Sequence, residues 1–242
     1  MRLEKVVGHR GAALRAPENT LAGFREAAAL GCRMVEFDVR LSRDGVPVVF
    51  HDDRLKRVTG AEGAVGETLL ADLKALDAGS HFSPAYKGET IPSLAEALAL
   101  LAELGLGFDL ELKADPGREY PLAEAAAALL ERRWPGSLPP PLVTSFEPLA
   151  LAALKARAPA LARGYLVEVL PREWRSEVER LGAVAVICSQ RLISREALRA
   201  VKSAGYPLLV YTVNHVERAR SLVADGVDAI ISDMPDAILA AL

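Results

Sequence analysis

Two carboxylates one residue apart, Glu36 and Asp38, lie within the apolar run Met34–Val39. The period-two pattern of β-branched and aromatic residues predicts a strand, so both carboxylates project from one face, about 7 Å apart. At that separation they repel by roughly 2 kcal/mol when the effective dielectric constant is near 20. A cation between them would convert this penalty into a binding site. An isolated pair of this kind more often marks the acidic, solvent-exposed face of a surface strand.

Chemically versatile side chains also line or end other strand-like runs. Two histidines, two basic residues and further carboxylates occur there: His9, Arg10, His51, Asp52, Asp109, Glu111 and Lys113. Later runs end in further polar residues: Ser145, Ser189, Gln190, Tyr211, Asn214 and Asp233. Taken singly, each has an ordinary explanation as a core histidine, a solvated turn residue, a packing tyrosine or a helix cap, and a cap is the favoured one for Asp233. Their concentration at the ends of successive strands instead predicts one site.

The residue types indicate the chemistry of that site. Three carboxylates with no cysteine among them would form an all-oxygen site, which suits Mg²⁺ or Ca²⁺ better than zinc. Histidines beside such an ion are candidates for a general acid and base because their pKa lies near neutrality. Arg10 and Lys113 offer positive charge for an anion such as phosphate. This combination predicts hydrolysis of a phosphate ester, and the sequence has no glycine-rich loop of the kind that binds nucleoside triphosphates.

Short apolar runs alternate with helical patterns over nearly the whole chain. The expected strands are Val6–His9, Met34–Val39, Val46–His51, Gly107–Lys113, Leu142–Phe146, Arg163–Val167, Ala183–Cys188, Leu208–Val213 and Val227–Ser232. The expected helices are Thr20–Leu30, Leu94–Leu104, Tyr120–Arg133, Leu149–Arg157, Arg172–Arg180, Arg195–Ala204, Val216–Ala224 and Pro235–Leu242. Strands separated by helices pair in parallel through right-handed crossovers. The Asp44-Gly45 turn predicts that Val46–His51 returns antiparallel to the strand before it, which leaves eight β/α units.

Eight units predict a (β/α)₈ TIM barrel, an α/β fold that occupies residues 1–242 as a single domain. A doubly wound open sheet is the alternative. Residues 52–92 break the alternation, since they are rich in Gly and Pro and show only a short helical pattern near Leu70–Leu76. A connection this long predicts a small inserted subdomain after the second-strand hairpin, over one edge of the barrel mouth. In such barrels the chemistry lies at the C-terminal ends of the strands, and Asn19 is expected to cap the helix that follows it.

Composition limits the partners and the location. Hydrophobic residues make up 51% of the chain, and the net charge of −3 without a dense basic cluster argues against a nucleic-acid partner. Cys32 and Cys188 have no C-x-x-C spacing, which predicts buried thiols in a reducing compartment. No apolar run is long enough to span a membrane, and the start of the chain lacks the pattern of a signal peptide. We therefore expect a cytoplasmic protein, and the sequence does not predict its oligomeric state.

The order and spacing of short motifs resemble those of the glycerophosphodiester phosphodiesterase family. The motifs are His9-Arg10-Gly11, Pro17-Glu18-Asn19-Thr20, Glu36-Phe37-Asp38-Val39, the stretch from Asp44 to Asp52, Glu111-Leu112-Lys113, the stretch from Tyr211 to Asn214, and the stretch from Gly226 to Asp233. They extend from His9 to about Pro235, and together they are far more specific than any one alone. The resemblance implies a (β/α)₈ barrel with a small insertion, and hydrolysis of glycerophosphodiesters to an alcohol and glycerol 3-phosphate.

The resemblance also implies roles for individual residues. They are metal ligands (Glu36, Asp38 and Glu111, for Mg²⁺ or Ca²⁺), an acid-base pair (His9 and His51), and substrate or phosphate contacts (Arg10, Lys113 and Tyr211). One histidine would take a proton from the nucleophile while the other protonates the leaving oxygen. The nucleophile is either water or a neighbouring glycerol hydroxyl that forms a cyclic phosphate. Departures from the residues usual in the family, such as Tyr211 where Trp is frequent, bear on which alcohol group of the substrate the enzyme prefers.

Three other functions stay open. A phospholipase-type phosphodiesterase of the same architecture would need an exposed apolar rim or a basic membrane-facing surface, and the insertion offers only Phe82 and Tyr86 as aromatic candidates. A metal-dependent lyase or isomerase with a lysine base would leave both histidines unused. A non-catalytic sugar-phosphate-binding protein would have no need of an acid-base pair.

Overall fold

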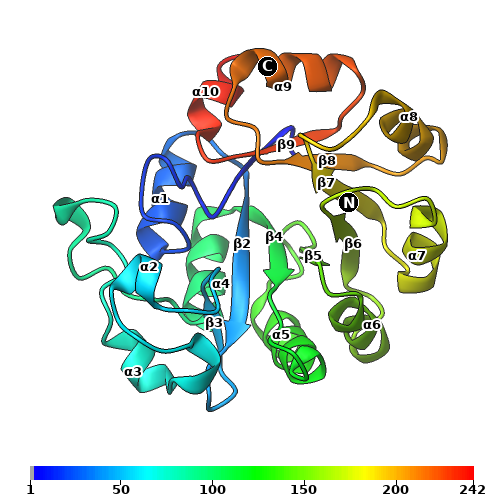
Figure 1. Ribbon diagram of the computed structural model, residues 1–242. Helices are drawn as coiled ribbons and strands as arrows, with labels where there is room; N and C mark the ends of the chain where they lie inside the picture. Colours follow the sequence, from blue (N-terminus) through cyan, green and yellow to red (C-terminus); the bar gives the residue numbers. More distant parts are fainter. Residues whose placement is uncertain (1–2) are drawn as a thin grey trace.

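The computed structural model describes residues 3–242, and its strands form a closed barrel with one antiparallel addition (Figure 1). The barrel strands are β1 (Val6–Gly8), β2 (Met34–Leu41), β4 (Gly107–Leu112), β5 (Leu142–Ser145), β6 (Ala162–Val167), β7 (Ala185–Ser189), β8 (Leu208–Tyr211) and β9 (Ala229–Ser232). β1 pairs in parallel with both β2 and β9, which closes the ring, and β3 (Pro47–Val49) pairs antiparallel with β2. The predicted (β/α)₈ barrel is confirmed, and the open sheet is excluded.

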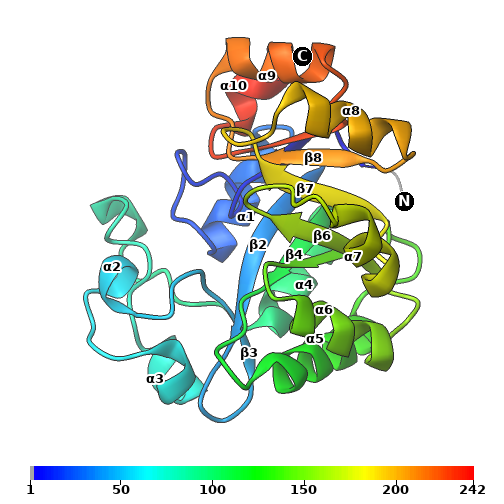
Figure 2. The ribbon, with the colours of Figure 1, turned by 45° about the vertical axis from the view of Figure 1, so that its right-hand side comes forward.

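Helices form the outer layer of the barrel (Figures 1 and 2). They are α1 (Leu21–Ala29), α4 (Leu94–Leu104), α5 (Glu119–Arg133), α6 (Pro148–Arg157), α7 (Trp174–Leu181), α8 (Arg195–Ser203), α9 (Val216–Ala224) and α10 (Pro235–Leu239). The alternation along β4 shows how the layers separate. Phe108, Leu110 and Leu112 pack into the apolar cluster shared with the helices, whereas Asp109 and Glu111 face the barrel interior. One strand therefore supplies core packing outward and chemistry inward.

The segment between β3 and α4 contains four short helical elements. They are α2 (Lys56–Thr59), the 3₁₀ turn η1 (Val65–Glu67), α3 (Leu70–Lys74) and the 3₁₀ turn η2 (Pro84–Tyr86). The segment packs around an apolar cluster of its own, which includes Phe50, Leu55, Val58 and Leu73. Figures 1 and 2 show it at one side of the barrel, next to α1.

Two local details complete the fold. The cap of α1 is Thr20, whose hydroxyl accepts the N–H of Gly23, so the expectation that Asn19 caps this helix is wrong. Cys32 and Cys188 are buried free thiols, as expected. Within residues 3–242, each helix is too short or too polar to cross a membrane.

Candidate active site

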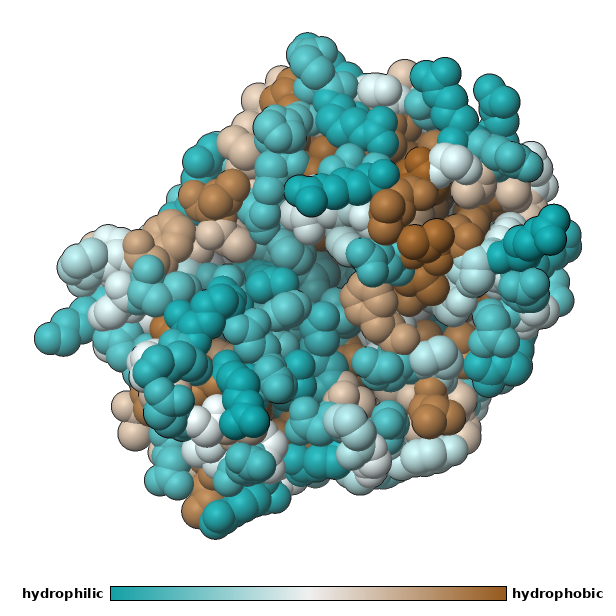
Figure 3. Space-filling model, viewed as in Figure 1, coloured by the Kyte–Doolittle hydropathy of each residue, from teal (hydrophilic) through white to brown (hydrophobic). Residues whose placement is uncertain are grey.

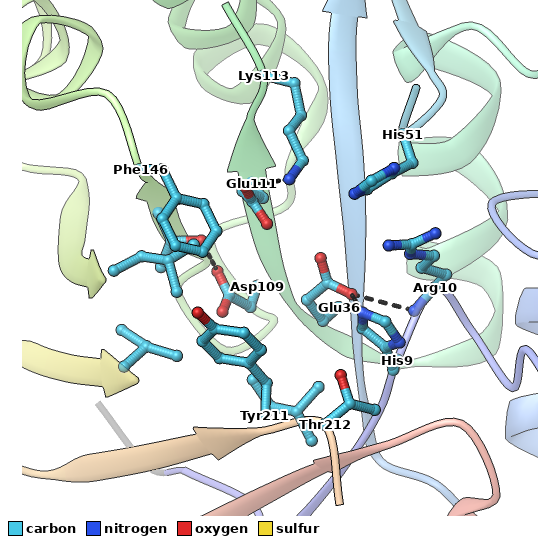
Figure 4. Close-up of a pocket in the computed structure, with 14 residues that line it drawn as sticks. His9, Arg10, Glu36, His51, Asp109, Glu111, Lys113, Phe146, Tyr211 and Thr212 are labelled. Carbon is cyan, nitrogen blue, oxygen red and sulfur yellow. Dashed lines mark hydrogen bonds and ion pairs between the residues drawn. The ribbon is translucent and has the colours of Figure 1, made fainter. Parts of the chain in front are cut away.

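A cavity of about 180 Å³ opens at the C-terminal ends of the barrel strands (Figures 3 and 4). One side is polar and charged: His9, Arg10, Glu36, His51, Asp109, Glu111 and Lys113. The other side is mostly apolar: Thr144, Phe146, Leu166, Ile187, Tyr211, Thr212 and Ile231. Asp38 is 1% exposed and lies against Arg10 and Lys113. The structure therefore brings all eight predicted site residues together.

Glu36, Asp38 and Glu111 converge because of strand register. Asp38 and Glu111 lie side by side across β2 and β4, and Glu36 lies two residues earlier on the same face. One carboxylate oxygen from each residue lies within 4.8 Å of the other two. Burial, followed by the negative charge of Asp38, raises the pKa of both Glu36 and Glu111. For Asp38, burial is outweighed by the positive charges of Lys113 and Arg10, so its pKa is lowered.

This acidic group fits a divalent cation. Glu111 Oε1 is buried and, among the residues that the structure describes, has no donor in hydrogen-bonding geometry. The charged partner of this oxygen is Lys113, whose Nζ lies 2.6 Å away. Three buried carboxylates with oxygens within 4.8 Å of one another are the kind of donor set that Mg²⁺ and Ca²⁺ prefer. An ion there would also offset the burial and the repulsion that raise the two glutamate pKa values.

The two histidines are held in the same way. Nδ1 of His9 donates to Asp233 Oδ1 at 2.5 Å, and Nδ1 of His51 donates to Asp52 Oδ1 at 2.7 Å. Because a carboxylate only accepts, each ring keeps its proton on Nδ1 and leaves Nε2 free for a reacting group. Burial alone would lower the pKa of His9, but the bond to Asp233 and the charge of Glu36 outweigh it and raise the pKa. Burial is the main cause that lowers the pKa of His51.

Asp233 was expected to cap a helix, and that expectation is wrong. The residue before α10 is Met234, and the Asp233 carboxylate instead accepts from His9 and, at 2.6 Å, from the amide of Asn214. The position of Asp233 at a strand end placed it among the candidate site residues, but its contact with His9 was not predictable, because the two residues meet only when β9 closes the barrel beside β1.

Arg10 and Lys113 bring positive charge to the acidic group, Arg10 beside Glu36 and Lys113 beside Glu111 (Figure 4). The Arg10 guanidinium donates to Glu18 at 2.9 Å and lies 3.4 Å from Asp38, while its backbone N–H donates to Glu36 at 3.0 Å. The turn that places Arg10 depends on Gly8, where a Cβ would lie 2.0 Å from a backbone carbonyl oxygen. Lys113 lies 3.5 Å from Asp38.

Asn19 is a site residue that the sequence led us to read as a helix cap. Its amide donates to Asp38 Oδ2 at 2.8 Å, and its carbonyl oxygen accepts the Asp38 backbone N–H at 3.2 Å. To make both bonds, Asn19 adopts φ 56°, in the left-handed region that few non-glycine residues occupy. Asn19 therefore fixes the orientation of one member of the acidic group.

Two further residues shape the interior of the cavity. Asp109 accepts from the Thr144 hydroxyl at 2.8 Å, and burial raises its pKa to about 8. Tyr211 donates its hydroxyl to the backbone oxygen of Val167 at 3.1 Å and places its ring edge-on to Phe146. Tyr211 therefore offers the cavity an aromatic face.

An apolar rim borders the cavity, which the sequence did not lead us to expect. Phe146, Leu149, Val169 and Leu192 follow the C-terminal ends of β5, β6 and β7, and each is 38% to 58% exposed. Figure 3 shows apolar side chains beside the hollow on one side. The only aromatic candidates expected for such a surface were Phe82 and Tyr86 in the insertion, whereas this rim lies after β5, β6 and β7.

A (β/α)₈ barrel with a buried acidic triad, an oriented imidazole pair and two cations at its C-terminal rim is typical of a hydrolase that acts on phosphate esters. The Glycerophosphoryl diester phosphodiesterase family model matches residues 9–237, and the chain belongs to this family of phosphodiester hydrolases.

Individual relatives agree with this assignment. A glycerophosphodiester phosphodiesterase of Caldanaerobacter subterraneus is 33% identical over 97% of this chain and 96% of its own. The structure of an Oleispira antarctica phosphodiesterase, in complex with the product sn-glycerol-3-phosphate, matches with a TM-score of 0.97 and 41% identity over 99% of this chain and 96% of that one. A glycerophosphodiester phosphodiesterase from Agrobacterium tumefaciens matches with a TM-score of 0.81 and 29% identity over 98% of this chain and 100% of that one. The resemblance inferred from the motifs is confirmed.

Proposed function

We propose that the protein hydrolyses glycerophosphodiesters to an alcohol and glycerol 3-phosphate with the aid of Mg²⁺ or Ca²⁺. The observation that carries this proposal is the convergence of the acidic triad, the imidazole pair and two cations on one cavity of about 180 Å³. The Oleispira phosphodiesterase complex with glycerol 3-phosphate supports the product. A cytoplasmic location also stays a proposal, and it rests on the two free thiols.

The acidic and basic residues bind and polarise the phosphate in this proposal. Glu36, Asp38 and Glu111 would hold the divalent ion, which would supply positive charge to polarise the phosphate. Arg10 and Lys113 contact the other phosphoryl oxygens, and their fixed charges stabilise the negative charge that develops in the transition state. Because both cations already lie beside Asp38, they need little rearrangement when the phosphate arrives.

The imidazole pair moves the protons. One of His9 and His51 accepts a proton at Nε2 from the nucleophile, and the other donates a proton from Nε2 to the leaving alkoxide oxygen. The nucleophile is water or a neighbouring glycerol hydroxyl, and in the second case water then opens the cyclic phosphate. Asp233 and Asp52 hold the two rings and stabilise each imidazolium as it forms. Tyr211 and Phe146 form the wall against which the organic part of the substrate rests.

The test is a panel of diesters incubated with purified protein and a divalent ion. The panel contains glycerophosphocholine, glycerophosphoethanolamine, glycerophosphoinositol and intact phosphatidylcholine, and the assay quantifies glycerol 3-phosphate and the free alcohol. We expect glycerol 3-phosphate from the glycerophosphodiesters. Release of a phosphorylated alcohol such as phosphocholine, or no cleavage of any member, would contradict the proposal.

The apolar rim favours a second candidate, a phosphodiesterase that acts on lipid diesters. Phe146 lines the cavity, and Leu149, Val169 and Leu192 are exposed at the same end of the barrel, where they offer an acyl chain apolar contact. The same panel separates the two functions, because faster cleavage of phosphatidylcholine than of glycerophosphocholine would favour this candidate.

A further inference from the structure

Arg57, on α2 of the segment between β3 and α4, joins two carboxylates at the edge of the site. Its Nε and Nη2 donate to Asp52 at 2.6 and 2.9 Å. Its Nη1 and Nη2 donate to Glu18 at 2.8 and 2.6 Å. The guanidinium thus makes four hydrogen bonds, two to each carboxylate.

Each of these carboxylates holds a residue that lines the cavity. Asp52 accepts from Nδ1 of His51 at 2.7 Å, and Glu18 accepts from the Arg10 guanidinium at 2.9 Å. A continuous hydrogen-bonded chain therefore runs from His51 through Asp52, Arg57 and Glu18 to Arg10. It links a proton-transfer residue of the proposed reaction to a phosphate-binding residue.

We propose that Arg57 is a positioning residue that holds His51 and Arg10 in a fixed relative geometry through Asp52 and Glu18. This inference rests on the proposed function, because it gives Arg57 a part in that reaction. It also gives the segment between β3 and α4 a role in catalysis beyond covering the barrel.

The chemistry of the side chain explains why an arginine lies here. A guanidinium presents several N–H donors in a planar fork, so it can bind two carboxylates at once, whereas a lysine amine is a single point of charge. Without Arg57, the half-buried carboxylates of Glu18 and Asp52 would lose the positive charge of the guanidinium that pairs with both of them. Asp52 would then hold His51 less firmly, and Glu18 would keep only Arg10 as a partner.

The fold of the segment supports this placement. Leu55 and Val58, on either side of Arg57 in sequence, are 1% and 4% exposed and belong to the apolar cluster of the segment. They fix α2 to that cluster, while Arg57 points to the barrel and reaches residues of the loops after β1 and β3. The neighbouring Lys56 points away and pairs with the exposed Glu62.

The first experiment compares Arg57→Ala and Arg57→Lys with Lys56→Ala, a matched control on the same short helix. Steady-state kinetics with glycerophosphocholine measure kcat and KM, and circular dichroism checks that each variant is folded. Loss of a supporting partner of this kind lowers activity roughly 10- to 100-fold, and we expect this in kcat/KM for Arg57→Ala. Arg57→Lys should retain part of the activity because one amine can serve one carboxylate, and Lys56→Ala should match the native protein.

Two further variants distinguish positioning from a merely structural role. Asp52→Asn should lower mainly kcat, because it acts through His51, and Glu18→Gln should raise mainly KM, because it acts through Arg10. The Arg57→Ala variant should show both effects, and combining it with either change should cost less than the sum of the two single effects. Additive effects, or native kinetics in folded Arg57→Ala, would overturn the inference. If Arg57→Ala does not fold, native kinetics in Arg57→Lys would do the same.

The native protein serves as the test of the proposed function itself. If it cleaves no glycerophosphodiester, the proposed function fails, and calorimetric binding of glycerol 3-phosphate then decides the inference. Weaker binding to Arg57→Ala than to the native protein supports it, because Arg10 would be misplaced. Equal binding overturns it.

Discussion

At the scale of single residues, the two histidines are equivalent in one respect and different in another. Each has its Nδ1 held by an aspartate, yet the pKa of His9 is raised and that of His51 is lowered. The bond to Asp233 and the nearby Glu36 charge favour the protonated form of His9. Burial with Arg10 and Lys113 nearby opposes protonation of His51.

Replacement of either histidine by alanine should therefore reduce turnover without unfolding the protein. We expect kcat to fall by roughly 10²–10⁴ for His9→Ala and for His51→Ala, which is the usual contribution of a positioned acid or base. Stopped assays with glycerophosphocholine measure the effect, with thermal unfolding as the control. Turnover equal to that of the native protein in both variants would refute the acid-base assignment.

The residues of the acidic triad should determine the affinity for the divalent ion. In Glu111→Gln the side chain keeps its shape but loses its charge and one of its two oxygens, so binding of Mg²⁺ and Ca²⁺ should weaken at least tenfold, as for loss of a supporting ligand partner. Isothermal titration of metal-stripped protein measures this directly. Asp109→Asn is the matched control, because Asp109 lies on the same face of β4 but outside the triad, and it should bind the ion as the native protein does.

The types of individual residues predicted most of the side chains that line the cavity, but not the partners that hold those side chains in place. The sequence identified the residues that line the cavity because they lie at strand ends with recognisable chemistry. It did not identify Asn19, Asp233 and Arg57 as partners of site residues. Their contacts depend on barrel closure or on the fold of the segment after β3, and neither leaves a local pattern.

At the scale of elements, two strands in register place the metal ligands. β2 pairs with β4 so that Met34–Val39 lies beside Gly107–Leu112, and this register makes Asp38 and Glu111 direct neighbours across the two strands. The loop before α1 then reaches over β2, and Asn19 binds Asp38 from that side.

Asn19 should therefore contribute to stability as well as to the site. Hydrogen bonds to a charged group contribute about 1.5–3 kcal/mol, and both Asn19→Ala and Asn19→Gly lose them. Alanine should be the less stable of the two by about 1 kcal/mol, because the left-handed backbone strains a residue with a Cβ. Urea unfolding gives the free energies. Equal stability of the native protein and Asn19→Ala would show that the two bonds contribute nothing.

The strands and long helices were predictable because their hydrophobic periods are regular. Most bounds agree within one or two residues, and α4 and α9 agree at both ends. The four short elements between β3 and α4 were missed except near Leu70–Leu76. Each of them is three to five residues long and depends on the shared apolar cluster for its stability, so the local sequence carries little signal.

At the scale of the whole molecule, the buried carboxyls couple metal, pH and stability. Glu36, Asp109 and Glu111 all have raised pKa values, Asp109 to about 8. Between the ordinary carboxyl pKa near 4 and these raised values, the metal-free folded protein binds more protons than the unfolded chain. Its stability is therefore greatest at the acid end of that window and falls as the pH rises toward 8. His9 acts in the same direction and His51 in the opposite one.

Thermal unfolding of chelator-treated protein should show this fall between pH 5 and pH 8. A saturating divalent ion should raise the midpoint most at pH 8, where it replaces the missing protons. At 100 times Kd the stabilisation is about 2.7 kcal/mol, or roughly 5–10 °C for a chain of this size. The Asp109→Asn variant should show a smaller pH effect, since it removes one of the three groups. A midpoint that rises steadily from pH 5 to pH 8 without metal would contradict the coupling.

The most direct measurement is hydrolysis of glycerophosphocholine by protein that has been stripped of metal and then titrated with Mg²⁺ or Ca²⁺, with bound ion and released glycerol 3-phosphate quantified together. We predict that stripping abolishes turnover, that one ion per chain restores it, and that a variant with Glu36→Gln, Asp38→Asn and Glu111→Gln neither binds the ion nor recovers. Full turnover by the metal-free protein, or undiminished ion binding by the triple variant, would contradict the account.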